Sequence, residues 1–275
     1  MKINEIEKIL ITGGIEQNEA RIEAKMLIEH FLGLDATDLL INDEFEASAD
    51  LFEAAKLRAT THKPIQHILG YAHFMGEDFI VNEHVLIPRD ETEILVRRAI
   101  EIINQNDFKK VLDIGAGSGC ITCMIAKSTE AQVLGVDIST GALQIALDNS
   151  SKLGLFNKAI FRKSDIFSNI HADEKFDLIV SNPPYIAPSE RGKLQKEVEF
   201  DPELALFTND NDGIEFYDKI IKGAPDYLNK NGYLLFELGI GQAEKVKSLM
   251  QQRGFKNIGI DKDLAGIERI IWGRK

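Results

Sequence analysis

Four consecutive residues combine hydrogen-bond acceptors with a rigid backbone: Asn182, Pro183, Pro184 and Tyr185. Each proline fixes its own φ angle and restricts the residue before it to extended geometry. Asn182 offers a side-chain carbonyl oxygen, Pro183 a main-chain carbonyl without an N–H of its own, and Tyr185 a flat aromatic face. Two acceptors beside an aromatic ring suit a planar NH2 group, as in a carboxamide or a nucleobase. A proline-rich turn that closes a strand is the alternative interpretation.

The apolar run at 176–181 directly precedes this tetrapeptide. A run of that length bounded by prolines indicates a buried parallel strand that ends at a turn. Ligands of open α/β sheets bind outside the carboxyl ends of such strands. We therefore expect the tetrapeptide to line a ligand site.

A glycine-rich segment follows another short apolar strand, predicted at 111–114, and precedes a predicted helix. It consists of Gly115, Ala116, Gly117, Ser118 and Gly119. Glycines at such a turn let a ligand approach the backbone at a helix N-terminus. The dinucleotide fingerprint and the P-loop are both incomplete here, since Cys120 stands where the fingerprint needs glycine. Asp113, two residues before the first glycine, suits a ligand with a positively charged amine.

Two further acids follow the next two predicted strands. Asp137 can accept hydrogen bonds from both hydroxyls of a ribose, as it would in an NAD site, so it does not by itself distinguish the cofactor. Asp165 could accept from an adenine amino group, with Ile166 and Phe167 beside the ring, or it could be a loop or cap residue. The carboxyl ends of these strands share one edge of the sheet, so we expect one cleft.

The rest of the chain suggests three parts. Residues 1–75 carry apolar positions at helical spacing and are expected to form a small helical bundle. Its acids, such as Glu19 and Glu23, are expected on a solvated face, with a docking surface as the alternative. Residues 64–93 alternate loosely around Gly70 and Gly76, as in a hairpin, and 76–93 are expected to link the two domains. Residues 94–275 alternate strands and helices and predict a seven-stranded α/β sheet whose last two strands pair antiparallel.

Two segments near the expected cleft keep alternative interpretations. Arg89, beside three carboxylates, is expected to shape one wall of the site. Its neighbours could equally be an ordinary helix start, with Asp90 or Thr92 as the cap and acids in the first turn. The long segment at 187–213 could fold over a substrate or be an insertion.

Composition narrows the class of partner. The net charge of −12 argues against a protein that grips nucleic acid through phosphates, which needs clustered Lys and Arg. No apolar stretch approaches ~20 residues and no signal peptide is evident, so we expect a cytoplasmic monomer without membrane contact. Scattered histidines imply no metal site, and Cys120 and Cys123 are interpreted as packing residues rather than a redox or metal pair.

These residues resemble known enzymes. The stretch 113–119 together with Asp137 is similar to the S-adenosylmethionine-binding signature of class I methyltransferases, and 182–185 is similar to the motif of amino-group methyltransferases. Four segments resemble the peptide-chain release factor glutamine N5-methyltransferases, the PrmC/HemK family: 64–70, 87–93, 181–186 and 263–269. The resemblance runs nearly end to end. Asp90 stands where this family usually has proline, and Ile166 where it often has an aromatic residue.

The resemblance implies a class I methyltransferase (Rossmann-like) fold with S-adenosylmethionine as the cofactor. The implied substrate is the glutamine in the Gly-Gly-Gln loop of class 1 release factors, whose methylation modulates translation termination. It further implies that residues 1–75 recognise the substrate. The implied cofactor-binding residues are Asp113, Gly115, Ala116, Gly117, Ser118, Gly119, Asp137, Asp165, Ile166 and Asn182, and the implied substrate-binding residues are Asn182, Pro183, Pro184, Tyr185 and Arg89, the first four being catalytic.

Two other hypotheses stay open at this point. A DNA or RNA adenine N6-methyltransferase would use the same tetrapeptide on a flipped base, but it would need a basic groove that the acidic balance argues against. A non-catalytic binding module with a vestigial cleft is the other, and the intact acids and glycines argue against it.

Overall fold

The computed structural model describes residues 3–34, 36–41, 44–46 and 48–275. The chain forms two compact units. One comprises Met1–Tyr71 together with Gln195–Phe200, and the other comprises Ala72–Leu194 together with Asp201–Lys275. No helix in the described ranges is both long enough and apolar enough to span a membrane.

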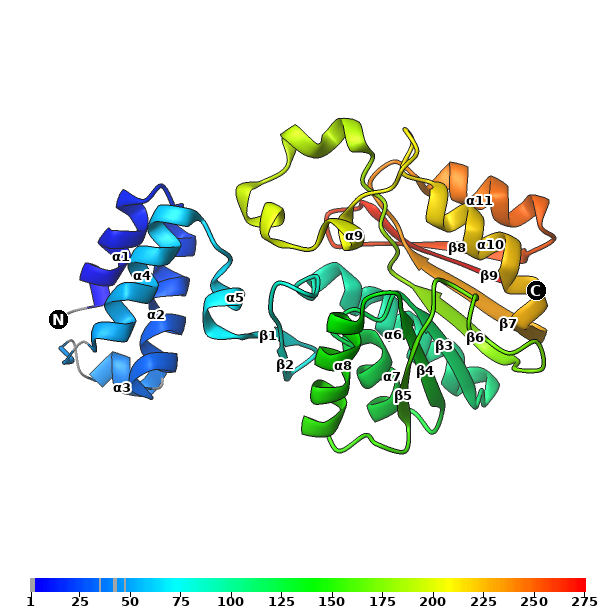
Figure 1. The fold of residues 1–275 in the computed structure, drawn as a ribbon, viewed down its shortest axis with the longest axis horizontal. Helices are drawn as coiled ribbons and strands as arrows, with labels where there is room; N and C mark the ends of the chain where they lie inside the picture. The colour runs from blue at the N-terminus through cyan, green and yellow to red at the C-terminus, as the bar shows by residue number, and fades with distance from the viewer. Residues whose placement is uncertain (1–2, 35, 42–43, 47) are drawn as a thin grey trace. The chain divides into compact units, whose positions relative to one another are not determined.

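The first unit is a small helical bundle, as the sequence predicts. Apolar side chains such as Ile6, Leu27 and Leu51 face one another and are fully buried. The residue that follows α1, Gly13, lies against α4: a Cβ at this position would be 2.3 Å from the carbonyl oxygen of Ala59. The elements are α1 (Ile3–Thr12), α2 (Gln17–Leu32), α3 (Ala36–Ile41), α4 (Ala49–Thr61), α5 (Ile65–Leu69) and the 3-10 helix η2 (Lys196–Phe200) (Figure 1).

A buried charged cluster ties η2 into this unit. The guanidinium of Arg58, 1% exposed, donates to both carboxylate oxygens of Glu23 at 3.0 and 2.9 Å. It also donates to Glu197 at 2.9 Å and to Glu19 at 3.1 Å. Glu23 is 4% exposed, so the prediction that it belongs to a solvated face was wrong. The spacing of apolar residues predicts which face of α2 is buried. It does not predict that Arg58 on α4 pairs with Glu23 and so allows this acid to lie on the buried face.

The second unit is built on a seven-stranded sheet, with strand order β5-β4-β3-β6-β7-β9-β8. The strands from β3 to β7 pair in parallel, and β9 pairs antiparallel with both β7 and β8. Both the number of strands and the antiparallel final pair confirm the prediction. The strands are β3 (Lys110–Ile114), β4 (Gln132–Asp137), β5 (Ala159–Lys163), β6 (Phe176–Ser181), β7 (Leu228–Glu237), β8 (Lys256–Lys262) and β9 (Glu268–Arg274).

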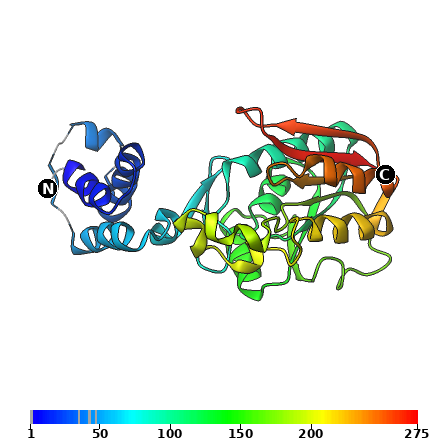
Figure 2. The same ribbon diagram turned by 90° about the horizontal axis from the view of Figure 1, so that it is seen from above.

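Helices cover both faces of this sheet (Figures 1 and 2). Side chains alternate along β3, so that Val111 joins the core under α6 and α7 while Leu112 joins the core under α10 and α11. Cys120 and Cys123 lie in the first of these cores. The helices are α6 (Asp90–Asn106), α7 (Cys120–Ser128), α8 (Thr140–Lys152), α10 (Glu215–Tyr227) and α11 (Ala243–Gln252).

A two-stranded hairpin precedes α6. Its strands are β1 (Tyr71–Phe74) and β2 (Glu77–Ile80), and the chain reverses at Met75 and Gly76, which both have positive φ angles, 51° and 83°. The turn at Gly76 confirms the hairpin that the sequence predicts there, and its first strand begins at Tyr71, before the expected start of the linker at residue 76. The segment between β6 and α10 contains the 3-10 helix η1 (Pro188–Lys193), η2 and the short helix α9 (Glu203–Leu206).

Candidate active site

The ends of β3 and β6 bring the two predicted site segments together. These strands are parallel neighbours in which Ile114 pairs with Ser181, and the Ser181 hydroxyl donates to the Ile114 carbonyl oxygen at 2.6 Å. The residues that follow are Gly115 and Asn182. A Cβ on Gly115 would lie 3.9 Å from the main-chain oxygen of Asn182. The glycine loop and the tetrapeptide are thus adjacent at one edge of the sheet.

The glycine loop presents two of its residues to a pocket. Gly115 and Gly117 line it, both with positive φ angles, 79° and 53°, and Gly117 has open space where a side chain would begin. Ala116 and Ser118 are buried. Gly119 serves packing, because a Cβ there would lie 3.0 Å from the Ala146 methyl carbon.

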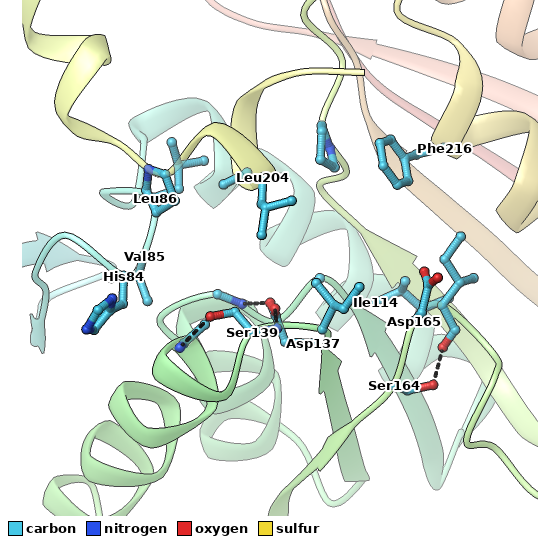
Figure 3. Close-up of a pocket in the computed structure, with 18 of the residues that line it drawn as sticks. His84, Val85, Leu86, Ile114, Asp137, Ser139, Ser164, Asp165, Leu204 and Phe216 are labelled. Carbon is cyan, nitrogen blue, oxygen red and sulfur yellow. Dashed lines mark hydrogen bonds between the residues drawn. The ribbon is translucent and has the colours of Figure 1, made fainter. Parts of the chain in front are cut away.

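Asp137 lies on the same pocket wall and holds the glycine loop (Figure 3). One carboxylate oxygen accepts the Gly117 N–H at 2.9 Å, and the other accepts the Ser139 N–H at 2.8 Å. Burial raises the pKa of Asp137, and these backbone hydrogen bonds oppose the rise. Each oxygen keeps a second lone pair, so the carboxylate can still accept from a diol in the pocket.

Asp113 is fully buried beneath the loop. One of its carboxylate oxygens accepts the Thr122 hydroxyl at 2.6 Å, and the other, Oδ1, has no partner in the described part of the chain. Burial raises the pKa of Asp113 to about 7, with the Thr122 hydrogen bond acting in the opposite direction. An unpartnered buried carboxylate oxygen is a costly feature, which a cationic ligand would offset.

The turn after β5 places Asp165 and Ile166 in the pocket wall. Ile166 has a φ of 51°, which is unusual for a β-branched residue, and the Ser164 hydroxyl donates to its carbonyl oxygen at 2.9 Å (Figure 3). Phe167 turns away and stacks on Tyr227, with ring centroids 4.6 Å apart. The structure therefore brings Ile166 to the pocket, but not Phe167, which the sequence analysis had set beside it.

The pocket also has an apolar wall, to which the 187–213 segment contributes three residues. Leu204 and Phe216, together with Leu86, Pro202 and Ala205, line it (Figure 3). Leu204 is 70% exposed. These residues come from the linker, α9 and α10, and no local pattern distinguishes them from ordinary loop and helix residues.

The tetrapeptide lies at the edge of the pocket. Pro184 is one of the pocket-lining residues, and Pro183 is buried. The Asn182 side-chain nitrogen donates to the Thr92 hydroxyl oxygen at 3.3 Å. The Tyr185 carbonyl accepts from Gln242 at 3.0 Å, and burial raises the pKa of the Tyr185 phenol, which therefore stays protonated at neutral pH.

Arg89 does not line this pocket. It donates to Asp201 at 2.7 Å, and the same carboxylate accepts the Ile87 N–H at 3.3 Å. The Asp201 side chain is fully buried, while that of Arg89 is 39% exposed. The ion pair holds Asp201, which directly precedes the pocket-lining Pro202. Arg89 therefore affects the pocket indirectly, by positioning the segment that lines it.

Comparison with known proteins gives matches over both units. Residues 3–70 match the family model "PrmC N-terminal domain", and residues 90–198 match "Methyltransferase small domain". The release factor glutamine methyltransferase of Geobacter sulfurreducens is 40% identical over 266 residues, covering 95% of this chain and 91% of that protein. The protein of the same name from Bordetella pertussis is 37% identical, with 92% and 94% covered.

A solved structure supports the fold. The T. thermophilus 16S rRNA N2 G1207 methyltransferase RsmC, in complex with AdoMet and guanosine, superimposes with a TM-score of 0.53 at 17% identity, covering 74% of this chain and 49% of that one. The sheet and its glycine loop thus define a class I methyltransferase, whose methyl donor is S-adenosylmethionine. Within that class, the chain belongs to the release factor glutamine methyltransferase family.

Proposed function

We propose that this enzyme methylates the side-chain amide nitrogen N5 of the glutamine in the Gly-Gly-Gln motif of class 1 peptide chain release factors. The methyl donor is S-adenosylmethionine, and the modification modulates translation termination. The names of the relatives support the release factor as substrate. The choice of the glutamine nitrogen rests on the chemistry of the tetrapeptide.

One observation carries this choice. In the described part of the chain, neither the Asn182 Oδ1 nor the Pro183 carbonyl oxygen accepts a hydrogen bond, while the Asn182 NH2 donates to Thr92. Two unoccupied acceptors at the pocket edge are the groups that a substrate NH2 requires, one for each of its protons. Asn182 and Pro183 would hold this NH2, and the half-buried ring of Tyr185 would lie beside it.

An amide nitrogen is a weak nucleophile because its lone pair is delocalised into the carbonyl. Hydrogen bonds that hold both N–H protons orient the nitrogen and favour its partial pyramidalisation, so positioning supplies much of the rate. When bound, S-adenosylmethionine supplies the electrophilic methyl group. No strong base is needed before transfer, since the amide proton becomes acidic as the nitrogen forms its new bond.

The pocket-lining residues, together with Asp113 buried beneath the glycine loop, fit S-adenosylmethionine. The unpartnered Oδ1 of buried Asp113 suits the cationic amine of a methionine moiety. Asp137 retains acceptor capacity for ribose hydroxyls, and Asp165, exposed at the pocket wall, would accept from an adenine amino group beside Ile166. The bare loop of Gly115 and Gly117 leaves room for the ligand to approach the backbone.

We extend the proposal to the organisation of the chain. Residues 1–75 would recognise the release factor, 76–93 would link, and 94–275 would carry catalysis. The match of residues 3–70 to the PrmC N-terminal domain supports a dedicated role for that part. The net charge of −12 favours a protein partner over direct nucleic-acid binding. A monomeric, cytoplasmic enzyme stays a prediction.

A methylation assay tests the proposal. The purified chain is incubated with labelled S-adenosylmethionine and, in separate reactions, with a class 1 release factor, with the same factor carrying Gly-Gly-Ala, and with duplex DNA. We expect one methyl group on the Gly-Gly-Gln glutamine, no label on the Gly-Gly-Ala factor, and loss of transfer with Asn182→Ala. Gly192→Ala, at a position with open space around it, is the matched control. Methyladenine with an unmodified release factor would overturn the proposal.

A further inference from the structure

A buried chain of hydrogen bonds lies behind Asn182. The Asn182 Nδ2 donates to the Thr92 Oγ1 at 3.3 Å, and the Thr92 hydroxyl donates to the Glu237 Oε2 at 2.7 Å. Thr92 and Glu237 are both 3% exposed. Because Ser181 pairs with Phe236 in the parallel β6–β7 ladder, the residues after them lie side by side: Asn182 directly follows β6, and Glu237 is the last residue of β7. Thr92 reaches both from the first turn of α6.

The Glu237 carboxylate fixes the donor-to-acceptor direction of these hydrogen bonds. A carboxylate can only accept, so the single Thr92 proton goes to Glu237 when that group is ionised. The Thr92 oxygen is then left as an acceptor, and the group of Asn182 that faces it must be the NH2. Asn182 also lowers the pKa of Glu237, as an amide whose N–H groups face the carboxylate would. The Asn182 carbonyl oxygen consequently points the other way.

The surroundings of Glu237 contain charges of both signs. Burial raises the pKa of Glu237 to about 7, the Thr92 hydrogen bond and the charge of Arg269 lower it, and the charge of Glu91 raises it. Arg269 in turn pairs with Glu91 at 3.3 Å and with Asp263 at 2.9 Å. Above neutral pH the carboxyl group is therefore ionised.

We infer that Thr92 and Glu237 are positioning residues that fix the orientation of the Asn182 amide, so that its carbonyl oxygen rather than its NH2 meets the substrate nitrogen. This inference rests on the proposed function. A reversed Asn182 amide would present N–H donors to the substrate NH2 and repel it. The helix-cap role that the sequence suggested for Thr92 does not account for the contact, because its hydroxyl is used by Glu237, and no side chain caps α6.

Kinetics at about pH 8.5, above the pKa of Glu237, test this role. Thr92→Val, and Glu237→Leu, which removes the acceptor of the Thr92 proton, should lower kcat about tenfold to a hundredfold, the range expected for a misoriented group. The Kd for S-adenosylmethionine should stay within about threefold of wild type, a difference well under 1.4 kcal/mol. Thr92→Ser, which keeps the hydroxyl, should recover most of the activity. Thr129→Val removes another buried hydroxyl, one that donates to Ile125 in α7, and is the matched control.

A substrate-free measurement separates this inference from the proposed function. In ¹⁵N-labelled protein, the Asn182 side-chain NH2, assigned by its loss in Asn182→Ala, should give a proton protected from exchange with water. Thr92→Val should abolish that protection, and Thr92→Ser should keep it. An unprotected NH2 in the wild type, or unchanged kcat in a folded Thr92→Val enzyme, would overturn the inference. Protection without release factor methylation would instead count only against the proposed function.

Discussion

The carboxylate of Asp137 accepts the backbone N–H of Gly117 at 2.9 Å, so the last residue of β4 fixes the loop that follows β3. The same side chain faces the pocket. One residue thus shapes the loop and presents acceptor oxygens to the pocket. This double use makes Asp137 a sensitive position for cofactor binding.

We expect Asp137→Ala to weaken S-adenosylmethionine binding about tenfold to a hundredfold, because hydrogen bonds to a charged group contribute about 1.5–3 kcal/mol. Asp137→Asn should weaken binding by nearly as much. Each carboxylate oxygen of Asp137 accepts a different backbone N–H, and an asparagine would place its NH2 against one of these donors. Calorimetric titration measures both. Asp148→Asn, at an exposed position on α8, is the control, and an Asp137→Ala protein with wild-type affinity would contradict this expectation.

Asp113 should make stability depend on pH. Its pKa is raised from 3.8 to about 7, so the folded chain binds this proton more tightly than the unfolded chain does. The resulting stabilisation is fully present below pH 4 and is lost as the pH rises toward and through 7. Asp113→Asn should therefore gain stability relative to wild type across that interval. Urea unfolding of both proteins between pH 4 and 8 provides the comparison, and a pH-independent difference would contradict it.

Removing the charge of Arg58 should destabilise the helical unit strongly. Arg58→Met leaves the buried carboxylate of Glu23 without its main partner, a change that typically costs about 3–5 kcal/mol. Adding Glu23→Leu should recover most of the loss, because an apolar pair of similar volume can replace a buried ion pair. Chemical unfolding followed by circular dichroism measures both variants. If the double variant were no more stable than the single one, the buried-charge explanation would fail.

Gly213→Ala should impair methyl transfer. A Cβ at this position would lie 2.1 Å from the Tyr185 carbonyl oxygen and 2.5 Å from the Gln242 Nε2, and the φ of 68° is itself unfavourable for alanine. The main chain of the tetrapeptide would have to move, and a shift of about 1 Å in a positioning group can cost about a hundredfold in rate. Steady-state kinetics beside Gly192→Ala, where space is open, reveal whether the effect is specific to Gly213.

The strands were predictable because the pattern of a few neighbouring residues is enough to define each of them. The apolar run at 176–181 coincides with β6, and the residues at 111–114 lie within β3. The glycine loop could likewise be recognised from its own residues. Each of these signals is contained in a few neighbouring positions.

Contacts between distant positions could not be predicted. The hydroxyl of Thr92 reaches Glu237, 145 residues away, although locally Thr92 suggests a helix cap. Ile166 adopts a left-handed conformation that an isoleucine gives no reason to expect. Leu204 lines the pocket three residues after Asp201, whose partner Arg89 lies 112 residues earlier in the sequence. The contacts of Thr92 and Asp201 join positions far apart in the sequence, and one sequence carries no record of such pairing.

The chain passes between its two compact units three times, after Tyr71, after Leu194 and after Phe200. The first unit therefore includes Glu197, which Arg58 contacts across 139 residues of sequence. A hybrid of two relatives joined at residue 71 would set the Arg58 of one parent against the residue 197 of the other. Exchange of the first unit between such enzymes, by recombination or by design, therefore requires three splice points, so that the 195–200 segment is transferred together with the N-terminal helices.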